Sequence, residues 1–207
     1  MESHVANFVR NSLYQLRQLR SVQQSLTLDA WRTVATVFIA SRLDYCNAVL
    51  YGAMIQVMQQ LQMVMNATAR MVTGCDKHVT AVLHDILHWL PVPHWTQFKI
   101  AFLAFNCTWG ASATYFQHVC IPAVNLSGRA NVHYVECGEL AVPRSATELC
   151  KRSFSIASLV IWNSLLGHLH LSSISKGQFR RGLKAHHFQQ AYDLWEPFVE
   201  ECIELNW

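Results

Sequence analysis

The chain has 207 residues, of which 52% are apolar and only 14% are charged, so it is long enough to bury the core of one domain or of two small ones. Its 16 Lys and Arg against 13 Asp and Glu give a net charge of +3, which excludes the strongly basic balance of an autonomous nucleic-acid-binding domain. Seven Cys without any C-x-x-C spacing argue against a disulfide framework, and we expect reduced thiols in an intracellular protein.

Apolar residues at helical spacing predict five helices in the first half of the chain. The predicted ranges are 5–19, 28–50, 54–72, 79–90 and 95–109. Gly52, Gly74 and Gly110 follow three of these segments as helix stops, and the Pro91-Val92-Pro93 run ends the fourth, because proline disfavours a helical residue before it. The sequence therefore predicts a three-helix unit followed by two further helices.

The character of the chain changes between residues 121 and 152, where Pro and Gly gather. Two short extended candidates, 132–135 and 140–142, make this segment an irregular connector with a hairpin candidate. Helical spacing returns over 154–169 and 175–195, where Ser175 is placed as an N-cap. The second of these helices is predicted to carry three basic residues on its exposed side: Arg180, Arg181 and Lys184.

We therefore expect a mostly α fold with about seven helices. The segments that organise it are 1–74, a three-helix unit; 75–120, further helices; 121–152, the irregular connector; and 153–207, the C-terminal helices. Two stretches, 45–69 and 100–128, lack charged residues, but the first holds four Gln and two Asn. Such groups are costly to bury in hydrocarbon, so we expect no membrane span.

One histidine pair has the spacing of a zinc site. His84 and His88 lie four residues apart in HDILH and would share one face of a helix. Asp85 stands where the zinc proteases of this spacing have their Glu base, and no third ligand is evident in the sequence. We interpret the pair as a surface or helix-end pair, and we expect no metal and no cofactor.

No arrangement for catalysis is evident. The chain has no G-x-S-x-G elbow, no phosphate-binding G-x-x-x-x-G-K-[ST] and no G-x-G-x-x-G. Transfer of nucleotides needs carboxylates gathered around divalent ions, whereas the only adjacent acidic pair is Glu200-Glu201 near the C-terminus, more typical of a solvated helix surface. We therefore expect no catalytic residues and no enzyme activity from the isolated chain.

A polar cluster interrupts the apolar second helix. The segment SRLDYCNAVLYG, residues 41–52, contains Arg42, Asp44, Tyr45 and Asn47. On one helix Arg42 and Asp44 fall on different sides, so we expect these polar groups to find partners on neighbouring helices and to tie them together.

This segment also closely resembles one in the C-terminal region of reverse transcriptases from LINE-type (non-LTR) retrotransposons. Further blocks resemble the same region in order, namely LQMVMNATARMVTG (61–74), LHWLPV (87–92), FKI (98–100), VPRS (142–145), RSFSIAS (152–158) and LVIWNSL (159–165). The blocks span most of the chain. Within them Trp89, Pro91, Trp162 and Asn163 are expected to be structural motif residues.

The resemblance implies a truncated copy of an RNA-directed DNA polymerase that lacks the palm and endonuclease of its family. Residues 1–74 would then be similar to the thumb, and the missing palm would be a partner of this surface. Arg10, Arg17 and Arg20, on the basic edge of the first helix, become candidates for contacts with the RNA or DNA backbone, weak and without sequence preference. Two alternatives stay open: the arginines form a solvated flank, or the chain is a helical host adaptor without a nucleic-acid role.

Overall fold

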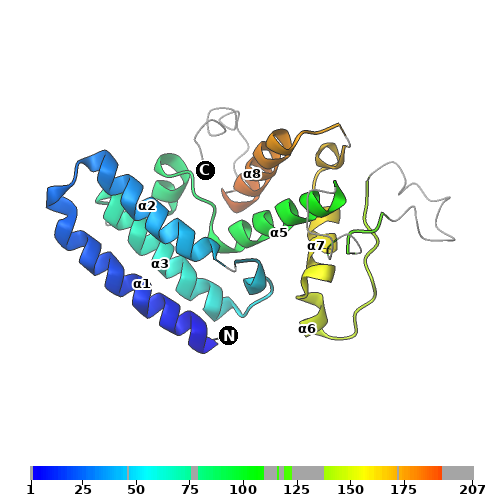
Figure 1. Ribbon diagram of the computed structural model, residues 1–207, viewed down its shortest axis with the longest axis horizontal. Helices are drawn as coiled ribbons and strands as arrows, with labels where there is room; N and C mark the ends of the chain where they lie inside the picture. Colours follow the sequence, from blue (N-terminus) through cyan, green and yellow to red (C-terminus); the bar gives the residue numbers. More distant parts are fainter. Residues whose placement is uncertain are drawn as a thin grey trace. The chain divides into compact units, whose positions relative to one another are not determined.

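The fold is mostly helical, as predicted. The computed structural model describes residues 2–45, 47–75, 79–109, 116, 119–122, 138–171 and 173–192. The α-helices of these residues are α1 (Glu2–Val22), α2 (Leu28–Asp44), α3 (Ile55–Thr73), α4 (Val79–Ala81), α5 (Val92–Thr108), α6 (Glu148–Lys151), α7 (Phe154–Asn163) and α8 (Lys176–Tyr192) (Figure 1). Within this part of the chain, extended pairing is limited to one antiparallel bridge between Pro122 and Leu140. The chain divides into two compact units, Met1–Pro93 and His94–Trp207.

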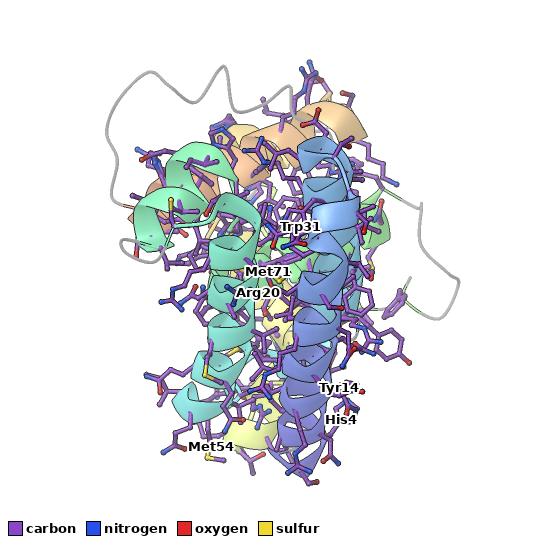
Figure 2. All side chains as sticks on the ribbon, turned by 90° about the vertical axis from the view of Figure 1, so that its left-hand side faces the viewer. His4, Tyr14, Arg20, Trp31, Met54 and Met71 are labelled. Carbon is purple, nitrogen blue, oxygen red and sulfur yellow. The ribbon has the colours of Figure 1, made fainter. Side chains whose placement is uncertain are left out.

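The first unit is built on α1, α2 and α3, which lie side by side (Figure 1). Its division from the rest of the chain at Pro93 lies beyond the predicted segment 1–74. Trp31 of α2 is 1% exposed, and its indole Nε1 donates a hydrogen bond of 3.3 Å to the backbone oxygen of Met71 on α3 (Figure 2). The other buried apolar side chains of the three helices are Val5, Val9, Leu16, Ala35, Leu43, Val57, Leu61, Val64, Met65, Ala69 and Val72.

The prediction of one helix over 28–50 was wrong, because α2 ends at Asp44. The backbone of Tyr45 is extended, with φ −66° and ψ 119°, which interrupts the helical hydrogen-bond ladder. Asn47–Leu50 forms a separate 3-10 turn, and Gly52 follows with a left-handed φ of 64°. The polar segment 41–52 therefore includes the last turn of α2 and, from Tyr45 on, part of the connection to α3.

Helix α3 matches its prediction closely. It ends at Thr73, and Gly74 adopts a left-handed φ of 70°. The N–H of Gly74 donates a 2.8 Å hydrogen bond to the Arg70 carbonyl, which closes the helix end in the way that glycine allows.

The predicted helix over 79–90 was also wrong in form. Helix α4 has only three residues and passes into a π-helical turn, Val82–Ile86. The N–H of Leu87 donates to the Val82 carbonyl at 3.0 Å, and His88 takes a φ of 50°, which ends the helical course. The wider turn lets Trp89 and Leu90 be buried directly before Pro91.

Helix α5 begins earlier than the predicted residue 95. Its first residue is Val92, and Pro93 stands in the first turn, where the missing proline N–H leaves no intrahelical bond unmade. The N–H of Val92 donates to the side-chain Oε1 of Gln62 on α3 at 2.9 Å. A half-buried glutamine therefore supplies the N-terminal cap of α5.

The second unit has an aromatic core. Phe179 of α8 is fully buried, and its ring stacks on Phe105 of α5 at 4.2 Å and lies 5.8 Å from the ring of Trp162 of α7. Leu169 and Leu183 complete this core and are also fully buried.

Three further expectations concern the second unit. The predicted connector contains a short helix, α6, whose first turn is capped by the Thr147 hydroxyl; the extended candidate 132–135 lies outside the described residues. Helix α7 ends at Asn163 rather than near 169, and Gly167–His170 forms a 3-10 turn instead.

The predicted N-cap of α8 is confirmed, because Ser175 Oγ accepts from the N–H of Gln178 at 3.2 Å. Lys184 is half-buried, so it does not share the exposed side with Arg180 and Arg181.

Candidate nucleic-acid interface

The predicted basic edge of α1 is exposed. Arg10, Arg17 and Arg20 all lie at the surface of this helix. Glu2 is the only acidic residue in the sequence of α1. Val5, Val9 and Leu16 turn the apolar face of α1 to the core, and the three arginines lie beside this face on the exposed part of the helix.

Helix α3 adds a basic group that the sequence alone did not point to. Its sequence has no acidic residue, and Arg70 in its last turn is exposed. Helices α1 and α3 run parallel from a shared start, since Ser3 and Gln56 line the same cavity, so Arg20 and Arg70 lie at the same end of the helix pair. Figure 2 shows Arg20 on the side of α1 that is turned toward α3, and Tyr14 on the other side. Both helices therefore carry an exposed positive charge at this end, and neither helix has a carboxylate there.

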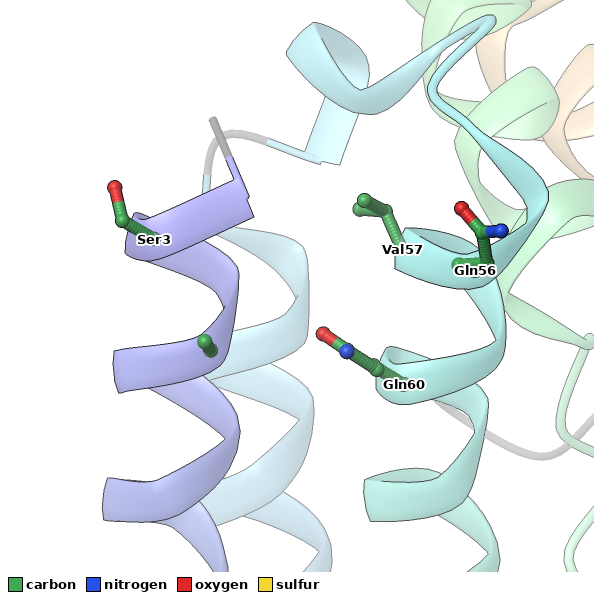
Figure 3. A pocket seen from close by; sticks show the side chains of 5 residues that line it. Ser3, Gln56, Val57 and Gln60 are labelled. Carbon is green, nitrogen blue, oxygen red and sulfur yellow. The ribbon is translucent and has the colours of Figure 1, made fainter.

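The other end of this surface holds a small polar cavity. Its volume is about 330 Å³, and it is lined by Ser3, Ala6, Gln56, Val57 and Gln60 (Figure 3). The lining offers one hydroxyl and two amides, which both donate and accept hydrogen bonds, but no charged side chain. The first turns of two helices meet here, and unpaired N–H groups give such ends a partial positive charge.

The polar residues of segment 41–52 occupy different surroundings. The guanidinium of Arg42 lies over the ring of Phe38, 4.7 Å from its centre and one turn back on the same helix. Asp44 is half-buried, Asn47 is 2% exposed and Tyr45 is 77% exposed. The contact of Arg42 is thus within α2, whereas a contact with a neighbouring helix was expected, and Tyr45 is not on a helix.

Trp89 and Pro91 belong to a structural tie between α3 and the start of α5. Trp89 is 5% exposed, and its N–H donates to the Leu83 carbonyl at 2.9 Å. Directly after Pro91, Val92 is held by Gln62, whose Nε2 also donates to Asn66 Oδ1 at 2.9 Å. Gln62 was not singled out from the sequence, because nothing in a helical pattern tells which surface amide meets a distant N–H.

Trp162 and Asn163 hold an irregular segment of the second unit. Trp162 Nε1 donates to the Gly138 carbonyl at 3.0 Å. The Asn163 side chain donates to the Leu140 carbonyl at 2.8 Å and accepts from the Leu140 N–H at 2.9 Å, so it pairs with the backbone as a neighbouring strand would. Gly138 has a φ of 65°, and a Cβ there would lie 2.9 Å from the Cβ of His170. These motif residues therefore have structural partners.

The histidine pair considered for zinc does not share a helix face. His84 lies in the π-helical turn and its Nδ1 contacts the Asp85 carboxylate, while His88 lies beyond the helix end with its positive φ. Among the described residues no group of three His, Cys, Asp or Glu side chains is arranged to hold a metal ion. The acidic pair Glu200-Glu201 lies outside those residues.

The buried thiol of Cys120 is not activated as a nucleophile. Burial, and next the neighbouring Cys107, raise the pKa of Cys120 to about 12. A thiol with this pKa stays protonated at neutral pH, and the thiolate is the reactive form.

In the part of the chain that the structure describes, no helix combines the length and the apolar character needed to cross a bilayer. A scan against protein-family models, a search of curated proteins and a search of solved structures find no match to this chain. The function is therefore argued from the surface itself.

Proposed function

We propose that the α1–α3 surface binds the sugar-phosphate backbone of nucleic acid, weakly and without sequence preference. The observation that carries the proposal is the exposure of Arg10, Arg17 and Arg20 along one edge of α1 and of Arg70 on the neighbouring α3, two helices whose only carboxylate is that of Glu2. Arginine recognises phosphate through its planar, permanently charged fork of donors. Contacts of this kind position a duplex and carry no base information.

The chain as a whole is then a fragment of a non-LTR reverse transcriptase that has kept a thumb-like contact surface and lacks the polymerising centre. Its motif blocks support this origin, and the Gln62 and Asn163 contacts give two of those blocks a structural role. The proposal that the chain lacks the polymerising centre is supported by the sequence, whose only adjacent acidic pair is Glu200-Glu201, since nucleotide transfer needs carboxylates gathered around divalent ions.

The expected affinity is low. Three phosphate contacts on a duplex give a slope of log affinity against log salt of about −3, since each contributes roughly −0.9 through counterion release. With a net charge of only +3 for the whole chain, we expect dissociation constants in the micromolar range or weaker.

The test is a fluorescence-anisotropy titration of an RNA–DNA duplex at several salt concentrations. The triple variant Arg10→Gln, Arg17→Gln, Arg20→Gln should lose most of the binding and most of the salt slope. A matched control removes three exposed charges elsewhere, Arg32→Gln, Arg144→Gln and Arg181→Gln, and should keep the slope. Absence of binding at low salt, or equal losses in the two triple variants, would overturn the proposal.

The absence of polymerase activity is tested separately by primer extension with the purified chain. We expect no incorporation above a no-enzyme control. Incorporation that disappears when an acidic residue is replaced would show a catalytic centre and contradict the fragment assignment, whatever the binding experiment gives.

A second candidate function is a helical adaptor that docks another protein chain. The observation in its favour is a run of exposed apolar side chains around the α2–α3 reversal, with Tyr45 at 77%, Val49 at 62%, Met54 at 53% and Ile55 at 70% exposure. The genomic sequence on the 5′ side separates the two candidates. A decayed palm and endonuclease frame there favours the retrotransposon fragment, whereas a promoter, introns and intact exons favour a host adaptor.

A further inference from the structure

Three histidines from distant parts of the sequence gather in the second unit. His187 of α8 is 2% exposed, and its ring centre lies 6.1 Å from that of His94 in the first turns of α5. His186, the preceding residue of α8, has its ring centre 5.4 Å from that of His187. The ring of Phe98, one turn along α5 from His94, lies edge-on to His187 at 6.5 Å. The imidazole of His187 is therefore enclosed by two further imidazoles and a phenyl ring.

Three ring nitrogens of this cluster lack a hydrogen-bond partner of good geometry. Neither Nδ1 nor Nε2 of His187 has a partner of good geometry, and Nδ1 of His94 has none either. The side chain of Gln190, on the same helix, acts in the other direction, because its hydrogen bonding favours the protonated form of His187. Its effect on the pKa of His187 is the smallest of those that act on this ring. An imidazolium needs an acceptor for both of its N–H groups, so a proton on His187 would leave buried donors unmet.

The charged and titratable groups around the cluster all act in one direction. From α5 His94 faces His187, from α8 His186 does so, and from the 3-10 turn before α8 His168 faces His186. The half-buried Lys184 of α8 adds a further cation on the same helix. Among the described residues, no carboxylate is one of the groups that shift the pKa values of these three rings.

The electrostatic effect follows from that geometry. Burial, and then the charges that His186 and His94 would carry, lower the pKa of His187 to about 3 from its ordinary 6.5. Burial lowers the pKa of His94, and burial together with His168 and His94 lowers that of His186. All three rings are therefore neutral in the folded unit at neutral pH.

We propose that this histidine cluster is an acid-sensitive latch, which holds α8 against α5 while its rings are neutral and releases α8 when they take up protons below about pH 6. Release would expose the residues that α8 buries, above all Phe179 and Leu183, both 0% exposed. The device is independent of the arginine surface of the first unit.

The direction of the pH dependence is fixed by linkage. Because the pKa of His187 is lower in the folded unit than in the released state, folding is fully favoured above pH 6.5 and weakens as the pH falls toward the folded value. For His187 alone, the equilibrium constant for release should rise about 30-fold between pH 7.5 and pH 5.0. Proton uptake by His94 and His186 adds to this rise.

Amide hydrogen exchange of the full chain tests the latch, with the protection of α8 (Lys176–Tyr192) compared at pH 7.5 and pH 5.0 after correction for intrinsic exchange rates. Helix α3 (Ile55–Thr73) is the internal reference, because its unit lacks the cluster. In the wild-type chain, α8 should lose about 30-fold more protection than α3 over this range.

The variant His187→Phe keeps an aromatic ring at this position and removes the proton site, so the excess loss should fall to the part that His94 and His186 contribute. His187→Leu serves in its place if the phenyl ring does not fit, and His4→Gln, an exposed site on α1, is the control that should keep the wild-type response. The latch proposal would be wrong if α8 and α3 of the wild-type chain lost hydrogen-exchange protection to the same extent. It would also be wrong if a folded His187 variant showed the same excess loss of protection in α8 as the wild-type chain.

Discussion

The two units of the molecule are stabilised by different kinds of contact. In the first, three helices meet along stripes of Val, Leu and Met, and the buried indole of Trp31 adds one bond between helices. In the second, side chains of α7 bind the backbone of an irregular segment, through Trp162 to Gly138 and Asn163 to Leu140. A repeating apolar pattern in the sequence is sufficient to specify the helix packing of the first unit. The contacts of the second unit depend instead on single residues.

The units also differ in the charged groups that matter. The first exposes arginines, whose charge does not change with pH in the accessible range, so salt is the variable that should act on it. The second buries histidines whose pKa values are lowered from the ordinary 6.5, so acid is the variable that should act on it. The same chain therefore combines one surface sensitive to ionic strength and one core sensitive to protons.

The largest expected effect is that of Trp162→Ala. Trp162 is 1% exposed, stacks on His170 at 4.9 Å and bonds to Gly138, so its removal leaves a cavity and an unmet carbonyl. We expect the second unit to lose about 3–5 kcal/mol of unfolding free energy. Urea unfolding followed by circular dichroism measures the loss, with Trp109→Ala, at 42% exposure, as the control. A loss below about 1 kcal/mol would show that this core is not closely packed.

A smaller effect is expected from the two amide side chains that bind distant backbone. Asn163→Ala leaves the N–H and C=O of Leu140 unpaired, at a cost of about 1–3 kcal/mol. Gln62→Ala removes one bond at the start of α5 and should cost about 1 kcal/mol, as the loss of a helix cap does. The measurement is again urea unfolding. Equal costs for the two variants would contradict the view that the second unit depends more on single polar residues.

The smallest effects come from two glycines, one in each unit. Gly74 has a φ of 70° and open space around it, so Gly74→Ala should destabilise the first unit by about 1 kcal/mol through backbone strain alone. Gly177, in the first turn of α8, also has open space but no positive φ, so Gly177→Ala should stabilise the helix by up to about 1 kcal/mol. Thermal unfolding of the two variants should therefore shift in opposite directions. Shifts of the same sign would refute this assignment.

Sequence periodicity was sufficient for α1, α3, α5 and α8, because each has a continuous apolar stripe and a recognisable end such as Gly74 or Ser175. It failed at the end of α2 and over 79–90. There the apolar spacing continues while the chain turns, and the turn is set by the extended Tyr45 and by the burial of Trp89. A helical pattern reports which residues are buried, but it does not distinguish a helix from a wide or broken turn that buries the same residues.

The candidate functional residues also divide into those that the sequence could predict and those that it could not. The exposure of Arg10, Arg17 and Arg20 was predictable, because the positions opposite an apolar stripe face solvent. The addition of Arg70 and the meeting of His94 with His187 were not, because both depend on which helices lie together. For Arg42 the sequence did not indicate the contact that the structure shows, which is with the ring of Phe38 one turn back on the same helix.

The bond between Gln62 and Val92 also bears on how the chain folds during its synthesis. A nascent chain of which only α1, α2 and α3 have left the ribosome still holds Trp89, Leu90 and Val92 inside the exit tunnel, and all three are buried in the finished unit. The first unit therefore cannot close until residue 93, at the division between the units, has left the tunnel. From that point it can fold as a whole before α8 has emerged, as N-terminal domains generally do. A pause in translation after residue 93 has emerged should favour this order, and a pause while Trp89 is still inside the tunnel should expose the nascent helices to chaperones.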